Sequence, residues 1–182
     1  MTDFKNTAYL SLNAGRVSFQ KEVQAHSQMI SVVIPVSNGE QTLERLVDEI
    51  SVLNDTSDKQ LKITEILLVW DGAQDNSAKV MQRLAAKNPL VKAVWLSRKF
   101  GQHAATLAGI ARSRGDWIVT LDESGTHAPS EIHHLVAAAL DGNYQLVYGI
   151  DKNQISNRTL KTNLKFLTLR LLKHQTEYPK RN

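Results

Sequence analysis

The chain has 182 residues and a formal net charge of +4, and its 42% hydrophobic and 22% charged composition is ordinary for one soluble globular domain. It contains no cysteine, which excludes disulfides and thiolate metal sites. No stretch approaches the roughly 20 apolar residues that a membrane span needs, and residues 1–16 lack the apolar core of a signal peptide. We therefore expect a cytoplasmic protein.

The positive charge is concentrated near the C-terminal end. Residues 158–182 contain seven Lys or Arg and one acid, a balance of +6, whereas residues 1–157 contain 15 basic and 17 acidic side chains, a balance of −2. The sequence pI of about 9.3 is therefore no evidence that the core binds nucleic acid, and we expect no nucleic-acid partner.

Residues 1–28 are polar, show little periodicity and predict an N-terminal arm, and residues 29–157 predict the core. The predicted strands are 29–36, 63–70, 91–96, 117–121 and 145–148. The predicted helices are 41–53, 77–87, 101–114 and 129–140. Strands that alternate with helices indicate an α/β fold with a mostly parallel sheet flanked by helices.

In such sheets a ligand binds in the crevice beyond the carboxyl ends of the strands. The first candidate there is Asp71, which ends an apolar strand and is followed by Gly72. Its carboxylate could accept hydrogen bonds from a nucleotide base or a ribose hydroxyl. Asp-Gly is also a common turn pair, so a purely structural turn explains the same residues.

The second candidate is the segment 96–105, in which Arg98, Lys99 and Gly101 precede a predicted helix. Cationic side chains and free backbone N–H groups at a helix start suit a phosphate. A solvated loop with a helix cap fits the pattern equally well. His103 has no evident acid or nucleophile partner, and such a histidine is more often structural than catalytic.

The third candidate is the turn after residue 121. Asp122 and Glu123 are adjacent, so in extended backbone they point to opposite faces. A same-side pair for Mg²⁺ or Mn²⁺ would be Asp122 with Ser124, which offers only a neutral hydroxyl, and His127 could add an imidazole. From these residues alone, a metal site and a plain turn are equally supported.

Four segments in register resemble the family-2 glycosyltransferases of the GT-A fold. Residues 31–40 (SVVIPVSNGE) resemble the family's first strand, Val-Ile-Pro-Val-Tyr-Asn, and residues 69–75 (VWDGAQD) resemble its Val-Asp-Asp-Gly-Ser-x-Asp. Residues 96–116 are similar to the subgroup that loads sugars onto polyprenyl phosphates such as dolichol or undecaprenyl phosphate. Residues 120–131 (TLDESGTHAPSE) stand where the family has Met-Asp-Ala-Asp-Leu-Gln-Asp/His-Pro-Pro-Glu.

This resemblance implies a nucleotide-sugar site at the strand ends. Pro35 and Val36 would lie under the base, and Asp71 would bind the base or the ribose. Arg98 and the loop up to Gly101 would lie near the diphosphate. Asp122 would lie near the ribose, the diphosphate or a Mg²⁺ or Mn²⁺ ion that acts as Lewis acid. The implied activity is that of a hexosyltransferase-type enzyme, which transfers a sugar from a nucleotide-diphosphate sugar to a lipid phosphate or a saccharide with inversion at the sugar carbon. The resemblance also implies a role in cell-envelope polysaccharide biosynthesis.

The chain also departs from the family pattern. Ser37 replaces the Tyr, Trp70 the first Asp, Ala73 the Ser, and Ser124 the second Asp of the Asp-x-Asp motif. Because serine is a poor substitute for an anionic ligand, we expect weakened metal binding. The family's catalytic base and acceptor region lie beyond where this chain stops, so we assign no catalytic residue and expect a C-terminally truncated fold.

Residues 158–182 predict a basic amphipathic helix, because Leu160, Leu164, Leu167 and Leu171 recur at helical spacing. Such a helix could lie on an anionic membrane, which would place the protein at the inner face of that membrane. It could equally cover the sheet.

Two hypotheses for the function remain open. The first is a glycosyltransferase domain, and the second is a degenerate relative that binds a nucleotide or a partner without turnover. A Rossmann dinucleotide enzyme is disfavoured, since no Gly-x-Gly-x-x-Gly follows the first strand.

Overall fold

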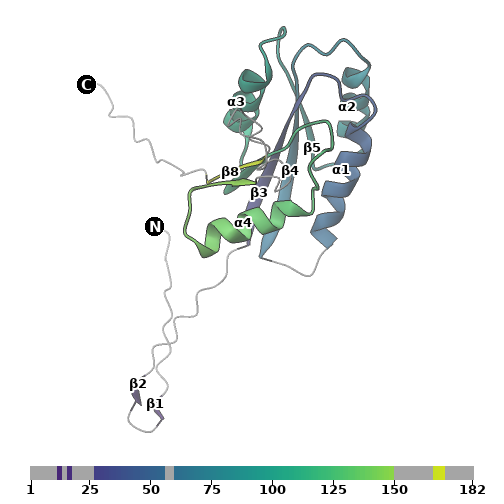
Figure 1. Ribbon diagram of the computed structural model, residues 1–182. Helices are drawn as coiled ribbons and strands as arrows, with labels where there is room; N and C mark the ends of the chain where they lie inside the picture. Colours follow the sequence, from purple (N-terminus) through teal and green to yellow (C-terminus); the bar gives the residue numbers. More distant parts are fainter. Residues whose placement is uncertain (1–11, 14–15, 18–26, 56–59, 150–165, 171–182) are drawn as a thin grey trace, which may run out of the picture.

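The computed structural model describes residues 12–13, 16–17, 27–55, 60–149 and 166–170 (Figure 1). The strands of the main sheet are β3 (Gln28–Val36), β4 (Leu61–Trp70), β5 (Val91–Trp95), β6 (Trp117–Thr120), β7 (Leu146–Gly149) and β8 (Phe166–Arg170). The helices are α1 (Leu43–Val52), α2 (Ser77–Lys87), α3 (Gln102–Arg112) and α4 (Glu131–Asp141), and a 3₁₀ turn, η1 (Leu53–Asp55), follows α1. Two short antiparallel strands, β1 (Leu12–Asn13) and β2 (Arg16–Val17), lie in the predicted arm.

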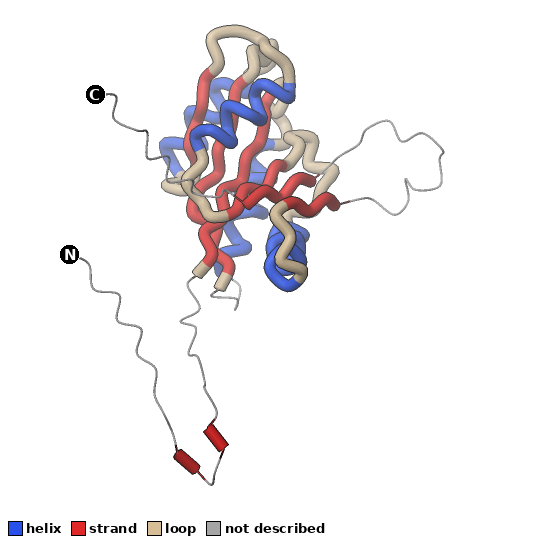
Figure 2. Tube along the Cα trace, turned by 90° about the vertical axis from the view of Figure 1, so that its left-hand side faces the viewer, coloured by secondary structure: helices blue, strands red, loops and turns tan. Residues whose placement is uncertain are grey.

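The six strands of the main sheet lie in the order β5-β4-β3-β6-β8-β7, and Figure 2 draws the strands in red and the helices in blue. The ladders that join β5, β4, β3 and β6 are parallel, and β8 is antiparallel to both β6 and β7. The α/β class, the mostly parallel sheet and the flanking helices are therefore confirmed. Within the core, each predicted strand and helix is present, with ends that differ by a few residues at most.

The sheet is covered on both faces (Figure 1). On one face, even-numbered residues of β3 such as Ile30, Ile34 and Val36 pack with the buried side chains of α1, α2 and α4. On the other face, Val33, Leu67 and Val69 pack against α3. Because β3 is buried on both faces, its residues 32–36 form a continuous apolar run without polar alternation.

Gly109 allows α3 to approach the sheet closely. A Cβ built on Gly109 would lie 2.3 Å from Cγ1 of Val33 and 3.0 Å from Cγ2 of Val69. Any side chain there would push α3 outward, and with it the loop that precedes the helix.

One acid is buried inside the sheet. Glu65 of β4 accepts hydrogen bonds from the Ser31 hydroxyl at 2.6 Å, from the Arg114 backbone N–H at 2.5 Å and from the Lys92 ammonium at 2.5 Å. Burial by itself raises the pKa of Glu65, but these hydrogen bonds outweigh it and leave the pKa below its usual value. The acid thereby joins β3 and β5 to the segment that enters β6.

The predicted C-terminal helix is wrong for the residues that the structure describes. Residues 166–170 form strand β8, which is inserted between β6 and β7. The sequence from Leu167 to Arg170 alternates apolar and polar residues as a strand can, and so short a segment does not by itself distinguish helix from strand. Backbone pairing with two neighbouring strands decides in favour of the strand. The rest of the tail, with its predicted membrane contact, lies outside the described residues, and the boundaries at 28/29 and 157/158 stay predictions.

Within the described residues, none of the helices combines the length and the apolar character that crossing a membrane requires.

Candidate functional site

The carboxyl ends of the four parallel strands meet at one edge of the sheet, and the loops that follow β3, β4, β5 and β6 gather there. We call this edge the loop edge and define it by residues 37–42, 71–76, 96–101 and 121–130. All the site residues predicted from the sequence lie on these loops or at the strand ends beneath them.

Asp71, at the end of β4, binds the loop that follows β5. Its side chain exposes 0% of its surface, and its two oxygens accept the backbone N–H groups of Phe100 at 2.6 Å and Gly101 at 2.8 Å. A nucleotide base or ribose could reach the carboxylate only if that loop moved away. In this conformation Asp71 positions the loop, and its contact with a base or ribose stays a prediction.

The two loops approach closely because glycine follows Asp71. Gly72 has φ +68°, and a Cβ on it would lie 3.0 Å from the backbone nitrogen of Lys99. Gly101 has φ +96° and directly precedes α3. The turn and the carboxylate thus act together, whereas the sequence presented them as alternatives.

The contact with Asp71 leaves cationic side chains on the surface of the loop. Arg98 and Lys99 are exposed, and the Arg98 guanidinium carbon lies 4.4 Å from the centre of the Phe100 ring. The backbone N–H groups of Phe100 and Gly101 already donate to Asp71, so these two groups are not available to a phosphate, whereas the exposed Arg98 and Lys99 side chains are. Pro35 and Val36 are buried at the end of β3 beneath these loops.

Glu123, after β6, makes a second contact of the same kind. Its carboxylate accepts the backbone N–H groups of Ser37 at 2.7 Å and Asn38 at 2.9 Å. Burial and the negative charges of Asp122 and Asp75 raise the pKa of Glu123, with burial as the largest cause. The two N–H groups lower this pKa, but they do not outweigh the other causes, so the pKa lies above its usual value. The sequence placed Glu123 on the face opposite to Asp122 but did not identify this partner.

A third set of contacts joins the loop after β3 to the start of α2. The Ser77 hydroxyl accepts the Gly39 N–H at 2.7 Å and also bonds to Asp75. Asp75 accepts the Glu40 N–H at 3.1 Å, and Glu40 in turn accepts the Asn76 N–H at 3.1 Å. Burial alone would raise the pKa of Asp75, but its hydrogen bonds lower it overall. This network was not predicted from the sequence, although an acid two residues before a helix-starting serine is a local sign of it.

The turn after β6 satisfies its own polar groups. Asp122 Oδ1 accepts the Ser124 N–H at 2.8 Å, and the Ser124 hydroxyl lies 2.9 Å from the Thr126 hydroxyl. Gly125 has φ +69°, and a Cβ on it would lie 2.6 Å from Nη2 of Arg45, so a cation lies against the turn. His127 is 8% exposed.

The donor set of this turn does not fit a metal site built by the protein alone. In the part of the chain that the structure describes, no group of three or more His, Cys, Asp or Glu side chains could hold a metal ion. Asp122 supplies one carboxylate that already binds its own turn, and Ser124 supplies a hydroxyl that already has a partner. The assignment of Asp122, Ser124 and His127 as metal ligands therefore stays an untested prediction without geometric support.

The chain is similar in sequence to known glycosyltransferases. The Glycosyl transferase family 2 model matches residues 31–182. The undecaprenyl-phosphate 4-deoxy-4-formamido-L-arabinose transferase of Pseudomonas fluorescens is 42% identical over 130 residues, which are 70% of this chain and 37% of that protein. This chain thus spans less than half the length of that relative.

Solved structures share the fold at low sequence identity. The mannosyltransferase PcManGT of Pyrobaculum calidifontis, in complex with GDP-Man and Mn²⁺, aligns with a TM-score of 0.64 and 17% identity over 80% of this chain and 45% of that chain. Residues 1–349 of TarS from S. aureus, in complex with UDP-GlcNAc, align with a TM-score of 0.54 and 14% identity over 71% of this chain and 38% of that chain. Both likenesses concern the arrangement of sheet and helices.

Proposed function

Because this chain belongs to glycosyl transferase family 2, we propose that its loop edge binds a nucleotide-diphosphate sugar for transfer of the sugar to a lipid phosphate. The observation that carries the proposal is the exposed Arg98, which lies on a loop fixed by Asp71 at the carboxyl ends of the parallel strands. A 42% identical relative is named for transfer to undecaprenyl phosphate, which favours a lipid phosphate over a saccharide as the acceptor.

The proposed roles follow from the charges and from burial. Arg98 and Lys99 would neutralise the diphosphate, since a guanidinium can bind two phosphate oxygens at once. Pro35 and Val36 form a buried, apolar support beneath the loops. Asp71 and Glu123 act as positioning residues, because each fixes the backbone of a neighbouring loop.

The reaction would be an inverting substitution at the anomeric carbon. An oxygen of the lipid phosphate forms a bond to that carbon, and the bond to the nucleoside diphosphate breaks, so that the nucleoside diphosphate leaves with the electron pair. A phosphate monoester is largely deprotonated at pH 7, because its second pKa is about 6. Its oxygen therefore needs no general base, whereas a saccharide hydroxyl would need one.

Nucleotide binding tests this proposal. We expect UDP and GDP, measured by isothermal titration calorimetry, to bind weakly and with little dependence on Mn²⁺. Ser124→Asp should make binding depend on Mn²⁺, since it restores a second carboxylate to the turn. Ser130→Asp, which adds the same charge at an exposed position just before α4, is the matched control. Absence of nucleotide binding in every variant would reject the proposal, and tight Mn²⁺-dependent binding of the unchanged chain would reject our reading of Ser124.

A second candidate function is a nucleotide-binding or interaction module without turnover. It is favoured by the turn after β6, in which Asp122 and Ser124 are bonded within the turn itself. The two functions differ in product formation. Incubation with undecaprenyl phosphate and labelled nucleotide sugars should yield a labelled lipid for the first function, and nucleotide binding without any labelled lipid for the second.

A further inference from the structure

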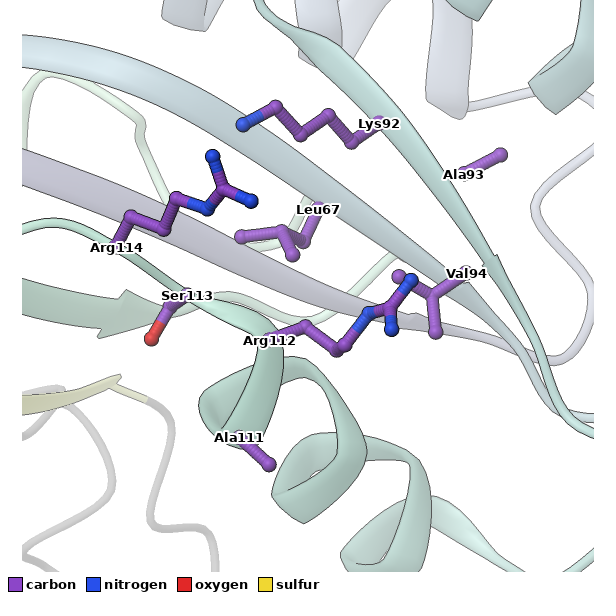
Figure 3. A pocket seen from close by; sticks show the side chains of 8 residues that line it. All are labelled: Leu67, Lys92, Ala93, Val94, Ala111, Arg112, Ser113 and Arg114. Atoms are coloured by element: carbon purple, nitrogen blue, oxygen red, sulfur yellow. The ribbon is translucent and has the colours of Figure 1, made fainter.

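A groove lies away from the loop edge, beside the sheet-edge strand β5. It has a volume of about 500 Å³, and its lining comes from β4, β5 and the C-terminal end of α3. Leu67 and Val94 contribute apolar surface, and Lys92, Arg112 and Arg114 contribute three cationic side chains (Figure 3). The volume lies in the usual range for small-ligand sites, roughly 300–1,000 Å³.

The three cations come from two separate parts of the chain. Figure 3 shows Lys92 and Arg114 extending towards each other beside Leu67, while Arg112 extends towards Val94. Lys92 is paired with the buried Glu65 at 2.5 Å. For Arg112 and Arg114, no ion pair is found among the described residues. With one acid for three cations, the groove has an excess charge of about +2.

Structural roles account for only part of this cluster. Arg112 in the last turn of α3 interacts favourably with the helix dipole, and a lysine on an edge strand discourages pairing with another sheet. Neither reason applies to Arg114, whose backbone N–H already performs a structural task by donating to Glu65. The Ser113 hydroxyl donates to the Ile110 carbonyl at 2.7 Å, so the side-chain donors left in the groove are the two guanidinium groups and the N–H groups of Lys92 that do not bind Glu65.

The groove is distinct from the loop edge. Helix α3 begins at Gln102, next to the loop that carries Arg98, and ends at Arg112, at the groove. An α-helix rises about 1.5 Å per residue, so the two ends of this helix are roughly 15 Å apart. One phosphate cannot bind at both places, and each can be tested without the other.

We propose that this groove is a second, phosphoryl-anion site, in which Arg112 and Arg114 bind a phosphate group between them. Two guanidinium groups without acidic partners can each donate two parallel hydrogen bonds to phosphate oxygens. The apolar floor at Leu67 and Val94 would accommodate the organic part of a phosphate ester. The ligand is either a soluble phosphate compound or the headgroup of an anionic lipid, and the chemistry of recognition is the same for both.

Calorimetric titration with inorganic pyrophosphate tests the site in the full chain at low ionic strength, where electrostatic binding is least screened. We expect Arg112→Gln with Arg114→Gln to weaken pyrophosphate binding at least tenfold. The matched control is Lys79→Gln with Lys87→Gln, which removes two exposed charges from α2, one of them in its last turn. That control should change the affinity less than twofold.

Three results would overturn the proposal. The first is that no pyrophosphate binds at millimolar concentration, and the second is that both double variants lose pyrophosphate affinity equally. The third is that Arg98→Gln lowers the pyrophosphate affinity tenfold while the groove variant, Arg112→Gln with Arg114→Gln, does not lower it. The last result would place the anion at the loop edge and would leave the proposed function standing. If the double variant fails to fold by circular dichroism, Arg114→Gln alone serves, with a weakening of at least threefold expected.

Sedimentation with vesicles distinguishes the two sources of the phosphate. Vesicles of phosphatidylcholine with phosphatidic acid should retain the unchanged chain more than the groove variant if the ligand is a lipid headgroup. Equal retention together with groove-dependent pyrophosphate binding identifies a soluble phosphate compound. Either pattern supports the site, because both require Arg112 and Arg114.

Discussion

Two carboxylates at the loop edge make the same contact in different surroundings. Asp71 and Glu123 each accept two consecutive backbone N–H groups from a loop that follows another strand. Asp71 exposes none of its surface, whereas Glu123 is partly exposed and lies near the charges of Asp122 and Asp75, which help to raise its pKa. The Asp71 carboxylate thus connects β4 to the loop 96–101 from a fully buried position, whereas the Glu123 carboxylate makes its contact where burial and two neighbouring acids oppose its ionisation.

The largest effect is expected for Asp71→Asn. An amide has one oxygen acceptor and one NH₂ donor group, so one of the two backbone N–H groups that bind the buried Asp71 side chain would face another donor. We expect the free energy of unfolding to fall by about 2–4 kcal/mol, because a hydrogen bond is lost and two donors are left facing each other at a buried side chain. Urea unfolding measures this, with Asp48→Asn on the exposed face of α1 as the control. A loss below about 1 kcal/mol would show that Asp71 does not hold the loop in place.

Alanine substitutions at Gly72 and Gly101 distinguish backbone strain at positive φ from steric contact between the two loops that Asp71 joins. Gly72→Ala places a Cβ at positive φ and 3.0 Å from the Lys99 nitrogen, whereas Gly101→Ala places one at positive φ where no described residue beyond its own chain neighbours comes within 4 Å. We expect losses of about 2 kcal/mol for Gly72→Ala and about 1 kcal/mol for Gly101→Ala. Hydrogen exchange at Phe100 should also accelerate more in Gly72→Ala. Equal effects in the two variants would mean that the close approach to Lys99 has no energetic weight.

The smallest effect at neutral pH is expected for Glu123→Gln, because this effect should decrease as the pH rises. A carboxyl with a raised pKa in the folded state contributes most stability below its unfolded pKa and loses it as the pH rises through the folded pKa. Gln does not titrate, so the destabilisation by Glu123→Gln, about 1 kcal/mol for a partly exposed group, should shrink from pH 4 to pH 7. Urea unfolding across this pH range measures the destabilisation.

Glu65→Gln is the reference of opposite sign, because the pKa of Glu65 is lowered and its contribution to stability is lost as the pH falls. A cost of Glu123→Gln that grows with pH would contradict the prediction.

For residues 29–149, the sequence by itself determined the order of strands and helices along the chain and the edge of the sheet at which the site residues gather. These features depend on local signals: apolar runs such as 29–36, helical spacing such as 77–87, and turn residues such as Asp71-Gly72. Because parallel strands end at one edge, locating the strands was enough to locate the candidate site.

Only the tertiary structure decided which groups the side chains bind. Asp71 and Phe100 are 29 residues apart and Glu123 and Ser37 are 86 apart, so no local pattern could identify either contact. The same limit explains β8, whose short sequence is ambiguous until β6 and β7 supply backbone partners. It also explains the groove, where Lys92 meets Arg112 and Arg114 only because α3 packs across the sheet. Periodicity is a property of neighbouring residues, whereas hydrogen-bond partners between distant loops are set by how the whole chain packs.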